Sequence, residues 1–501
     1  MKILKKSGLI IQLEALMKTN TNTITEEKSN GRIYTPLYIV ENILDLSGYF
    51  GTTILKKHVI DNSCGDGAFI CEIVRRYCKK AQEENFTIEE LSKDLSIYIH
   101  GIEIDKTERD KCIYNVNLVV KEYGVINVDW DIRCADTLQV HDYDKKMDYV
   151  LGNPPYVRVH NLGDSFDDIK QFSFSQGGMT DLFIVFYEIG LKMLNETGVL
   201  GYITPSSFFN SLAGSFMRKT FVYDCLIEKI VDLKHFQAFN ATTYTTIVIL
   251  NKNKKSDETE YYQFDESNLI PYYVETLTPN DYYIADNFYF APKEDLELLK
   301  KIFCNLGHSD ILVKNGYATL CDTVFIGDFS FESKHIIPVI KSSKGVKKKI
   351  IFPYDEGAKL ISEDELKEDT ALYEYLISQK STLIKRSNEK DNEKYWYAFG
   401  RSQAISDTFK DKLTINTLIR TANDFKFVDA PVGVGVYSGL YLISETISVS
   451  DIKKALVSDE FVRYISLLGK YKSGGYYTFS SKDVKSFLDY KFAYDGGLFI
   501  C

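Results

Sequence analysis

The chain has 501 residues, of which 45% are hydrophobic and 26% charged, and its formal net charge is −10. These values are ordinary for a folded protein of about two to four domains, and they exclude a disordered, collagen-like or disulfide-scaffold chain. The acidic balance argues against nucleic acid as a partner. The distribution of the charges along the chain and the motifs also bear on whether nucleic acid is a partner.

The acidic charge is confined to one part of the chain. Residues 1–300 contain 32 basic and 44 acidic side chains, whereas residues 301–501 contain 28 and 26. DNA binding depends on which face carries the cations, so the total charge does not exclude it.

The first 30 residues predict a short helical extension rather than a signal peptide, because Gln12 and Glu14 interrupt the apolar run. No run of about 18 apolar residues occurs, which predicts a cytoplasmic protein without a membrane span. The nine cysteines form no Cys-x-x-Cys pair and no Cys/His cluster at zinc spacing, so no metal site is predicted.

Short β-branched segments alternate with helical patterns up to about residue 250, as in a sheet built from βαβ units. Helices are predicted at 67–80 and 181–194, and the polar stretch 251–260 predicts a loop near the end of this unit. Beyond about residue 300 the alternation weakens, and we place a domain boundary there. The predicted strands are 58–61, 97–104, 128–134, 147–152, 199–204, 228–233 and 244–250.

The strongest motif is Asn153-Pro154-Pro155-Tyr156, which ends an apolar strand. The prolines stiffen the backbone, and the Asn153 side-chain oxygen and the Pro154 carbonyl can both accept hydrogen bonds. Two acceptors held close together suit a planar exocyclic NH2 group, and Tyr156 offers a flat face on which a base can stack. The alternative is a strand-ending turn with an exposed tyrosine.

A second motif runs from Asp61 to Phe69 and predicts a strand, a tight loop and a helix. Gly65 and Gly67 let the backbone approach a ligand closely. The third glycine of a dinucleotide-binding fingerprint is missing, and no Lys-Ser/Thr pair follows, which excludes a P-loop.

Acidic residues end the next two strands. Glu103, before Ile104, could accept hydrogen bonds from ribose hydroxyls, and Asp136, before Thr137, from an adenine amino group. Each acid alone is more readily explained as a solvated loop residue. Three such strand ends followed by Asn-Pro-Pro-Tyr on the fourth are typical of a ligand site at the carboxyl edge of an α/β sheet.

In this order the motifs resemble those of the gamma-class amino-group DNA methyltransferases, specifically the N6-adenine enzymes of restriction–modification systems. Tyr34 and Thr35 lie in a segment similar to the motif that precedes the glycine loop in this class. Segments 181–194 and 198–205 match the next two motifs in type and order. Asn62 departs from the pattern, because the family usually has proline there.

The resemblance implies an α/β fold with a Rossmann-like, mostly parallel methyltransferase sheet of seven strands in residues 31–300. Residues 301–501 are then a mixed α+β target-recognition domain. The resemblance also implies S-adenosylmethionine as the cofactor, double-stranded DNA as the substrate, and methylation of N6 of an adenine that is flipped out of the helix. A separately encoded restriction endonuclease is the expected partner protein.

The resemblance assigns roles to individual residues and requires no metal. The catalytic residues are Asn153, Pro154, Pro155 and Tyr156. The second aromatic residue that should sandwich the flipped base lies near 240–244 and is not identified. The cofactor-binding residues are Tyr34, Thr35, Asp61, Ser63, Gly65, Gly67, Phe69, Glu103, Ile104, Asp136 and Thr137.

Basic residues lie among aromatic ones in the second part of the chain, where they could contact phosphates and base edges. The predicted DNA-binding residues are Lys347, Lys348, Lys349, Arg401 and Arg420. A solvated loop explains the lysine run equally well, and core residues plus one surface arginine explain 395–401.

Three alternatives stay open. The first is an amino methyltransferase that acts on cytosine N4, RNA or a protein glutamine. The second is a fused restriction–methylation enzyme, which is disfavoured because only about 30 residues precede the first motif. The third is a non-catalytic DNA-binding specificity subunit, which the intact motifs disfavour.

Overall fold

The computed structural model describes residues 34–157, 169–178, 180–239, 243–386 and 393–493. The chain divides into two compact units, residues 1–296 and residues 297–501. The predicted helix in the first 30 residues lies outside the described ranges. Among the described helices, none is long and apolar enough to cross a membrane.

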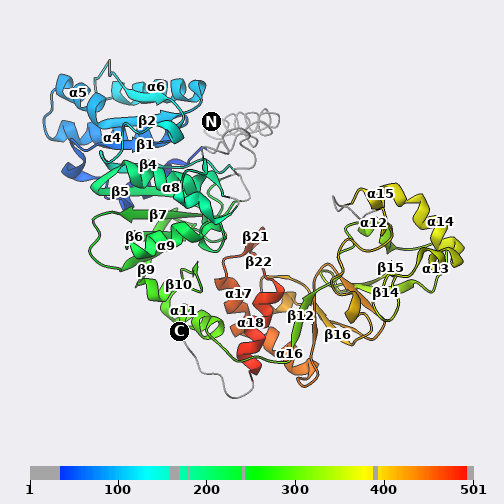
Figure 1. The fold of residues 1–501 in the computed structure, drawn as a ribbon. Helices are drawn as coiled ribbons and strands as arrows, with labels where there is room; N and C mark the ends of the chain where they lie inside the picture. Colours follow the sequence, from blue (N-terminus) through cyan, green and yellow to red (C-terminus); the bar gives the residue numbers. More distant parts are fainter. Residues whose placement is uncertain (1–33, 158–168, 179, 240–242, 387–392, 494–501) are drawn as a thin grey trace, which may run out of the picture. The chain divides into compact units, whose positions relative to one another are not determined.

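A sheet of nine strands forms the centre of the first unit (Figure 1), in the order β3-β2-β1-β4-β5-β7-β6-β8-β9. Strands β3, β2, β1, β4 and β5 are parallel neighbours, whereas β7 runs antiparallel to both β5 and β6. The strands are β1 (Val59–Asp61), β2 (Ile99–Glu103), β3 (Asp131–Cys134), β4 (Met147–Gly152), β5 (Leu194–Pro205), β6 (Ile227–Asp232), β7 (Thr245–Asn251), β8 (Thr259–Asp265) and β9 (Ile270–Leu277).

This sheet confirms the predicted mostly parallel α/β architecture, but the predicted count of seven strands was wrong. All seven predicted strands are present, and β8 and β9 extend the edge beyond β6. The polar stretch 251–260 contains the loop between β7 and β8 rather than the end of the sheet. Strand β8 pairs parallel with β6 and antiparallel with β9, so the two added strands form a hairpin on the sheet edge.

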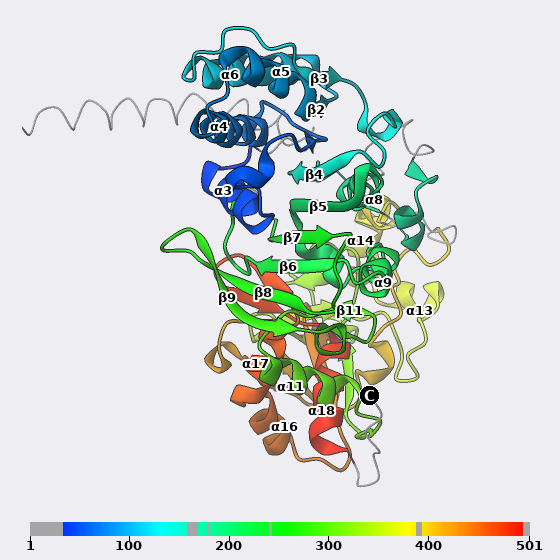
Figure 2. The same cartoon turned by 90° about the vertical axis from the view of Figure 1, so that its left-hand side faces the viewer.

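Helices cover both faces of the sheet, and close contacts at two glycines show this on β5. A Cβ on Gly201 would lie 2.4 Å from Ser47 Oγ, directly after α3, whereas a Cβ on Gly190 in α8 would lie 2.6 Å from Leu200 Cδ1. Because neighbouring strand residues point to opposite faces, α3 and α8 lie on opposite sides (Figure 2). The helices of this unit are α3 (Leu37–Leu46), α4 (Ala68–Glu83), α5 (Ile88–Tyr98), α6 (Lys106–Lys121), α8 (Leu182–Met193), α9 (Ser215–Tyr223) and α10 (Pro279–Tyr282).

The second unit mixes strands and helices. Its described strands form the sheets β12-β20-β16-β18, β13-β15-β14-β19 and β17-β22-β21. The strands are β12 (Leu312–Asn315), β13 (Ile326–Gly327), β14 (Ile336–Lys341), β15 (Val346–Ile351), β16 (Lys412–Ile415), β17 (Leu418–Ile419), β18 (Val428–Ala430), β19 (Gly435–Tyr437), β20 (Leu440–Ile443), β21 (Tyr471–Lys472) and β22 (Tyr476–Thr478). The helices are α12 (Asp322–Phe325), α13 (Glu363–Glu368), α14 (Thr370–Ser378), α15 (Lys380–Ile384), α16 (Val449–Leu456), α17 (Asp459–Leu467) and α18 (Ser481–Phe492), and α11 (Lys293–Phe303) connects the two units.

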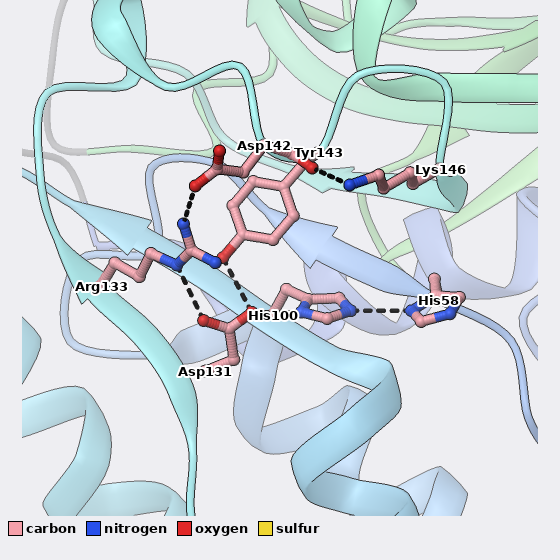
Figure 3. A network of polar contacts seen from close by, with 7 residues as sticks. All are labelled: His58, His100, Asp131, Arg133, Asp142, Tyr143 and Lys146. Atoms are coloured by element: carbon pink, nitrogen blue, oxygen red, sulfur yellow. Dashed lines mark hydrogen bonds and ion pairs between the residues drawn. The ribbon is translucent and has the colours of Figure 1, made fainter.

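A polar network ties β1, β2 and β3 together at their amino ends (Figure 3). His58 Nδ1 and His100 Nε2 lie 2.9 Å apart, and His100 Nδ1 lies 2.8 Å from Asp131 Oδ2. The Tyr143 hydroxyl donates to the same carboxylate oxygen at 2.9 Å, and Arg133 Nε donates to the other at 2.8 Å. Although burial alone raises the pKa of Asp131, these hydrogen bonds hold it well below its usual range.

We expect Asp131→Asn to lower the free energy of unfolding at pH 7 by roughly 1–2 kcal/mol, because it removes charge-assisted hydrogen bonds. A carboxyl whose folded pKa is depressed stabilises above its unfolded pKa and loses this effect as the pH falls through the folded pKa. The difference from the wild type should therefore persist from pH 7 to about 4 and shrink below that. Urea unfolding at several pH values measures it. Asp142→Asn, at the exposed end of the network, is the matched control, and an equal loss in both variants would contradict the account.

Candidate functional site

The carboxyl ends of three neighbouring strands, β1, β2 and β4, meet at one edge of the sheet. The Ser63 hydroxyl, from the loop after β1, donates to the backbone carbonyl of Asn153 after β4 at 3.2 Å. The Gly65 N–H donates to Glu103 Oε2 at the end of β2 at 2.9 Å. The glycine loop, the second-strand acid and the Asn-Pro-Pro-Tyr segment are therefore in direct contact.

The glycine loop needs its glycines for two different reasons. Gly65 and Gly67 have φ values of +51° and +94°, which L side chains rarely adopt. A Cβ on Gly67 would lie 2.8 Å from Cys112 Sγ of α6, so this glycine lets α4 pack closely against α6. A Cβ on Gly65 would meet nothing within 4 Å, so the loop borders open space there. This open space lies beside the amino end of α4, which favours negative groups.

Asn62 anchors the loop where the family usually has proline. Its side chain is fully buried, and its Oδ1 accepts a hydrogen bond from the Tyr202 hydroxyl at 2.9 Å. Its backbone carbonyl accepts one from the Thr137 hydroxyl at 2.6 Å. The departure from the family pattern therefore replaces proline stiffness with hydrogen bonds to β5 and to the segment after β3.

The predicted cofactor residues fall into two groups. Glu103 accepts backbone N–H bonds from Gly65 and Asp105, both at 2.9 Å, and Ile104 beside it is 68% exposed. Asp136 is half-buried and accepts from the Leu138 N–H at 3.0 Å. These residues border the edge of the sheet, whereas Thr137 and Phe69 are buried, and Phe69 packs in the hydrophobic core under the loop.

Asp61 is buried at the end of β1, with Oδ1 accepting the Ser63 N–H at 3.1 Å. Burial raises its pKa to about 8, and the nearby Glu103 charge adds to this against the Ser63 hydrogen bond. The neighbouring strand β4 packs closely against this carboxyl group, because a Cβ on Gly152 would lie 2.6 Å from Asp61 Oδ1. The site thus holds a carboxyl group that is neutral in much of the range where a free aspartate is ionised.

Asp61→Asn should stabilise the protein increasingly as the pH rises. A folded pKa of about 8 lies above the unfolded value of about 3.9, so the contribution of Asp61 to stability is full below pH 4 and is lost as the pH rises through 8. The variant minus wild-type difference in free energy of unfolding should grow by about 2–4 kcal/mol between pH 5 and 9. Urea unfolding measures it, with Asp257→Asn in the exposed loop after β7 as control. A difference that is constant with pH would show that Asp61 titrates normally.

Asn153 presents an unused acceptor at the end of β4. Its Nδ2 donates to Thr35 Oγ1 at 3.1 Å. Its Oδ1 is buried and has no hydrogen-bond partner among the described residues. An unsatisfied buried acceptor costs about 1–3 kcal/mol, so this atom suits a donor that arrives with a ligand. Tyr34, next to Thr35, is 49% exposed and donates to Glu108 Oε2 at 3.4 Å.

Tyr156 is held at both ends of its side chain. Its hydroxyl donates to the Ile203 carbonyl of β5 at 3.1 Å, and burial raises its pKa well above the usual value. Its ring meets those of Phe183 and Phe239 edge-on, with centroids 6.4 and 6.2 Å away. Phe239 directly precedes the region in which the second aromatic was expected, whereas Tyr244 contacts His235. The second aromatic residue therefore stays unassigned.

The predicted DNA-binding residues are spread over the second unit. Lys347, Lys348 and Lys349 lie on β15 and are all exposed, so they are solvated on a strand rather than in the loop of the alternative. Because strand residues alternate, Lys347 and Lys349 share one face and Lys348 points to the other. Trp396, Tyr397 and Phe399 of segment 395–401 are core, whereas Tyr395 is 45% exposed and Arg401 is on the surface.

Arg420 directly follows β17 and is exposed. Within the described ranges, no group of three or more His, Cys, Asp or Glu residues is arranged to hold a metal ion.

Comparisons with known proteins agree with the motif order. Residues 9–239 match the Eco57I restriction-modification methylase family. The chain is 30% identical over 268 residues to the type II methyltransferase M.BstVI of Geobacillus stearothermophilus, which covers 50% of this chain and 46% of that protein. It is 23% identical over 506 residues to the type II restriction enzyme and methyltransferase RM.Eco57I of Escherichia coli, covering 79% of this chain and 49% of that protein. The chain thus spans about half the length of these relatives.

The fold is shared with a solved restriction–modification enzyme. The structure of the type IIL enzyme MmeI in complex with DNA matches with a TM-score of 0.61 and 14% identity, over 95% of this chain and 66% of that one. As the motif order predicted, residues 9–239 are similar to restriction–modification methylases of the Eco57I family, and the target base stays a prediction.

Proposed function

We propose that this protein is a site-specific DNA methyltransferase that transfers a methyl group from S-adenosylmethionine to N6 of adenine in double-stranded DNA. The observation that carries the proposal is the buried, unpartnered Oδ1 of Asn153, which lies beside the glycine loop at the carboxyl edge of the sheet. An exocyclic amino group supplies the donor that this oxygen lacks. The restriction–modification relatives support DNA as the substrate.

The cofactor-binding residues line the ends of β1, β2 and β3. S-adenosylmethionine supplies an electrophilic methyl group when it is bound. Glu103 is held by two backbone N–H groups and accepts hydrogen bonds from the ribose hydroxyls. The exposed Ile104 covers a face of the adenine. Asp136 accepts from the adenine amino group, and the open space beside Gly65 takes the methionine end next to Tyr34 and Thr35.

The target adenine has to leave the double helix to reach Asn153, at a cost of a few kcal/mol. Stacking on Tyr156 offsets part of this cost, since base–aromatic stacking is worth about 1–3 kcal/mol. The second stacking ring stays unassigned, because Phe239 meets Tyr156 edge-on and leaves no parallel gap for a base between the two rings. Asn153 Oδ1 and the Pro154 carbonyl then hold the N6 hydrogens, which directs the nitrogen lone pair at the methyl group. The rate rests on this orientation, and Pro155 keeps the segment stiff.

The second unit is proposed to recognise the DNA sequence. Its near-neutral charge balance and its exposed cations, Lys347, Lys348, Lys349, Arg401 and Arg420, suit contacts to phosphates and base edges. A separately encoded restriction endonuclease stays a prediction. Cytosine N4 is the second candidate target, because its amino group has the same hydrogen-bonding geometry; Asn153, where cytosine enzymes more often carry serine, favours adenine.

Asn153→Ala should lower methyl transfer to DNA by at least about 10²–10³-fold, the cost of removing one preorganised polar group at a reacting centre. Cofactor binding, measured by calorimetry with S-adenosylmethionine, should survive. Transfer is followed with labelled S-adenosylmethionine and genomic DNA, and the modified nucleoside is identified by mass spectrometry. Asn268→Ala, in the exposed β8–β9 turn, is the control. Label in N4-methylcytosine, RNA or protein would contradict the adenine assignment, and unchanged activity would reduce Asn153 to a turn residue.

Replacing Lys347 and Lys349 together by Gln should flatten the salt dependence of DNA binding, with the slope of log K against log[salt] falling by about 1 per lost phosphate contact. The single variant Lys348→Gln, on the other face of β15, is the matched control and should change the slope less. Fluorescence anisotropy with a labelled duplex at roughly 50–200 mM salt measures the slopes of both variants. Equal slopes in the wild type and the double variant would remove β15 from the DNA interface.

A further inference from the structure

The small sheet β17-β22-β21 of the second unit carries a row of cationic and aromatic side chains. Lys472 of β21 pairs directly with Tyr476 of β22. On the other side of β22, Ile419 pairs with Tyr477, which puts the next residue, Arg420, across from Tyr476. The Arg420 guanidinium carbon lies 4.5 Å from the centroid of the Tyr476 ring. Lys472, Tyr476 and Arg420 therefore form a continuous row across the strands.

This row lies on the solvent face of the sheet. Ile419, which points to the opposite face from Arg420, is fully buried, and α17 packs against β22. Lys472 and Arg420 are exposed, and 52% of the Arg420 side chain is accessible. The hydrophobic core of this region thus lies on the other face of the sheet, and the side chains of the row contribute little to that core.

The charges of the row are only partly compensated. Asp424 Oδ2 lies 3.6 Å from Arg420 Nε, but that carboxylate oxygen is already held by the backbone N–H groups of Arg420 and Thr421 at 2.7 and 3.0 Å. Lys470, two residues before Lys472, is paired with Asp483 at 2.6 Å. Lys472 itself has no acidic partner in the described part of the chain. The row therefore presents net positive charge to solvent.

The hairpin that carries the row ends in an exposed tip with little side-chain bulk. Gly474 and Gly475 both have a φ of +76°, which lets β21 turn into β22 within three residues. The β21–β22 hairpin is the edge ribbon of this three-stranded sheet, and a two-stranded ribbon fits the major groove of B-DNA, which is about 12 Å wide. An arginine held over an aromatic ring keeps its planar fork oriented, and such a fork suits the O6 and N7 acceptors of guanine.

We propose that the β21–β22 hairpin enters the major groove of the DNA duplex, with Arg420 reading the edge of a guanine and Lys472 contacting a phosphate. Tyr476 positions Arg420 through the stacked contact. This inference rests on the proposed function and deepens it, because it names the element that reads the sequence. The hairpin would read the base edges of double-stranded DNA. The same surface should therefore discriminate poorly among the sequences of single-stranded DNA or RNA.

The test is a binding selection with the full chain and duplexes that carry a randomised core, followed by sequencing of the bound fraction. The wild type should select one motif. Arg420→Ala should select the same motif with a single G·C position made degenerate, equivalent to a loss of about 5–150-fold in discrimination there. Arg420→Lys should behave like Arg420→Ala, because it keeps the charge and loses the fork. Tyr476→Ala should show a weaker version of the same change, and Tyr476→Phe should not.

Lys472→Gln should weaken binding to all sequences alike and lower the salt slope by about 1. Lys454→Gln, an exposed lysine of α16 paired with Asp451, is the matched control and should change neither quantity. Thermal unfolding shows that each variant is folded. An unchanged motif in folded Arg420→Ala would overturn the inference while leaving methylation intact. A wild type that selects no duplex motif, or that prefers single strands or RNA, would overturn the inference and the proposed substrate together.

Discussion

The arrangement of the site depends on one hydrogen bond that the protein does not make. Asn153 Oδ1 is buried without a partner, although its amide is fixed through Thr35 and its backbone is fixed through Ser63. Neighbours from two other segments therefore hold this residue, one through its side-chain nitrogen and one through its backbone carbonyl. A buried acceptor without a partner lowers the stability of the folded protein. This cost is removed when a ligand donates a hydrogen bond to the acceptor.

The two edges of the sheet have opposite electrostatic character. At the carboxyl edge, Asp61 is buried with a raised pKa and Asn153 is left unsatisfied, and both features reduce the stability of the folded protein. At the amino edge, Asp131 is surrounded by donors from His100, Arg133 and neighbouring residues, and its pKa is lowered. Ligand sites commonly carry such destabilising features. The stabilising network around Asp131 lies at the opposite, amino edge of the sheet.

Sequence patterns predicted the first unit well because its strands are short, apolar and punctuated by turns. They missed β8 and β9, since a polar loop precedes them and Tyr-rich segments do not show clear alternation. The motif pattern predicted which strand ends meet. It did not separate buried Phe69 from the residues that border the edge of the sheet, because helix orientation decides this. The row around Tyr476 depends on contacts between segments that are distant in the sequence, which no local pattern encodes.

The central claim is that Asn153 Oδ1 accepts a hydrogen bond from the amino group of the target base. A double-mutant cycle tests it directly: the wild type and Asn153→Ala are each bound to a duplex with adenine at the modified position and to one with purine, which lacks the amino group. We predict that removing the amino group weakens binding by the wild type by about 5–30-fold, which corresponds to about 1–2 kcal/mol, and leaves the variant nearly unaffected. An equal loss in both proteins would contradict the claim.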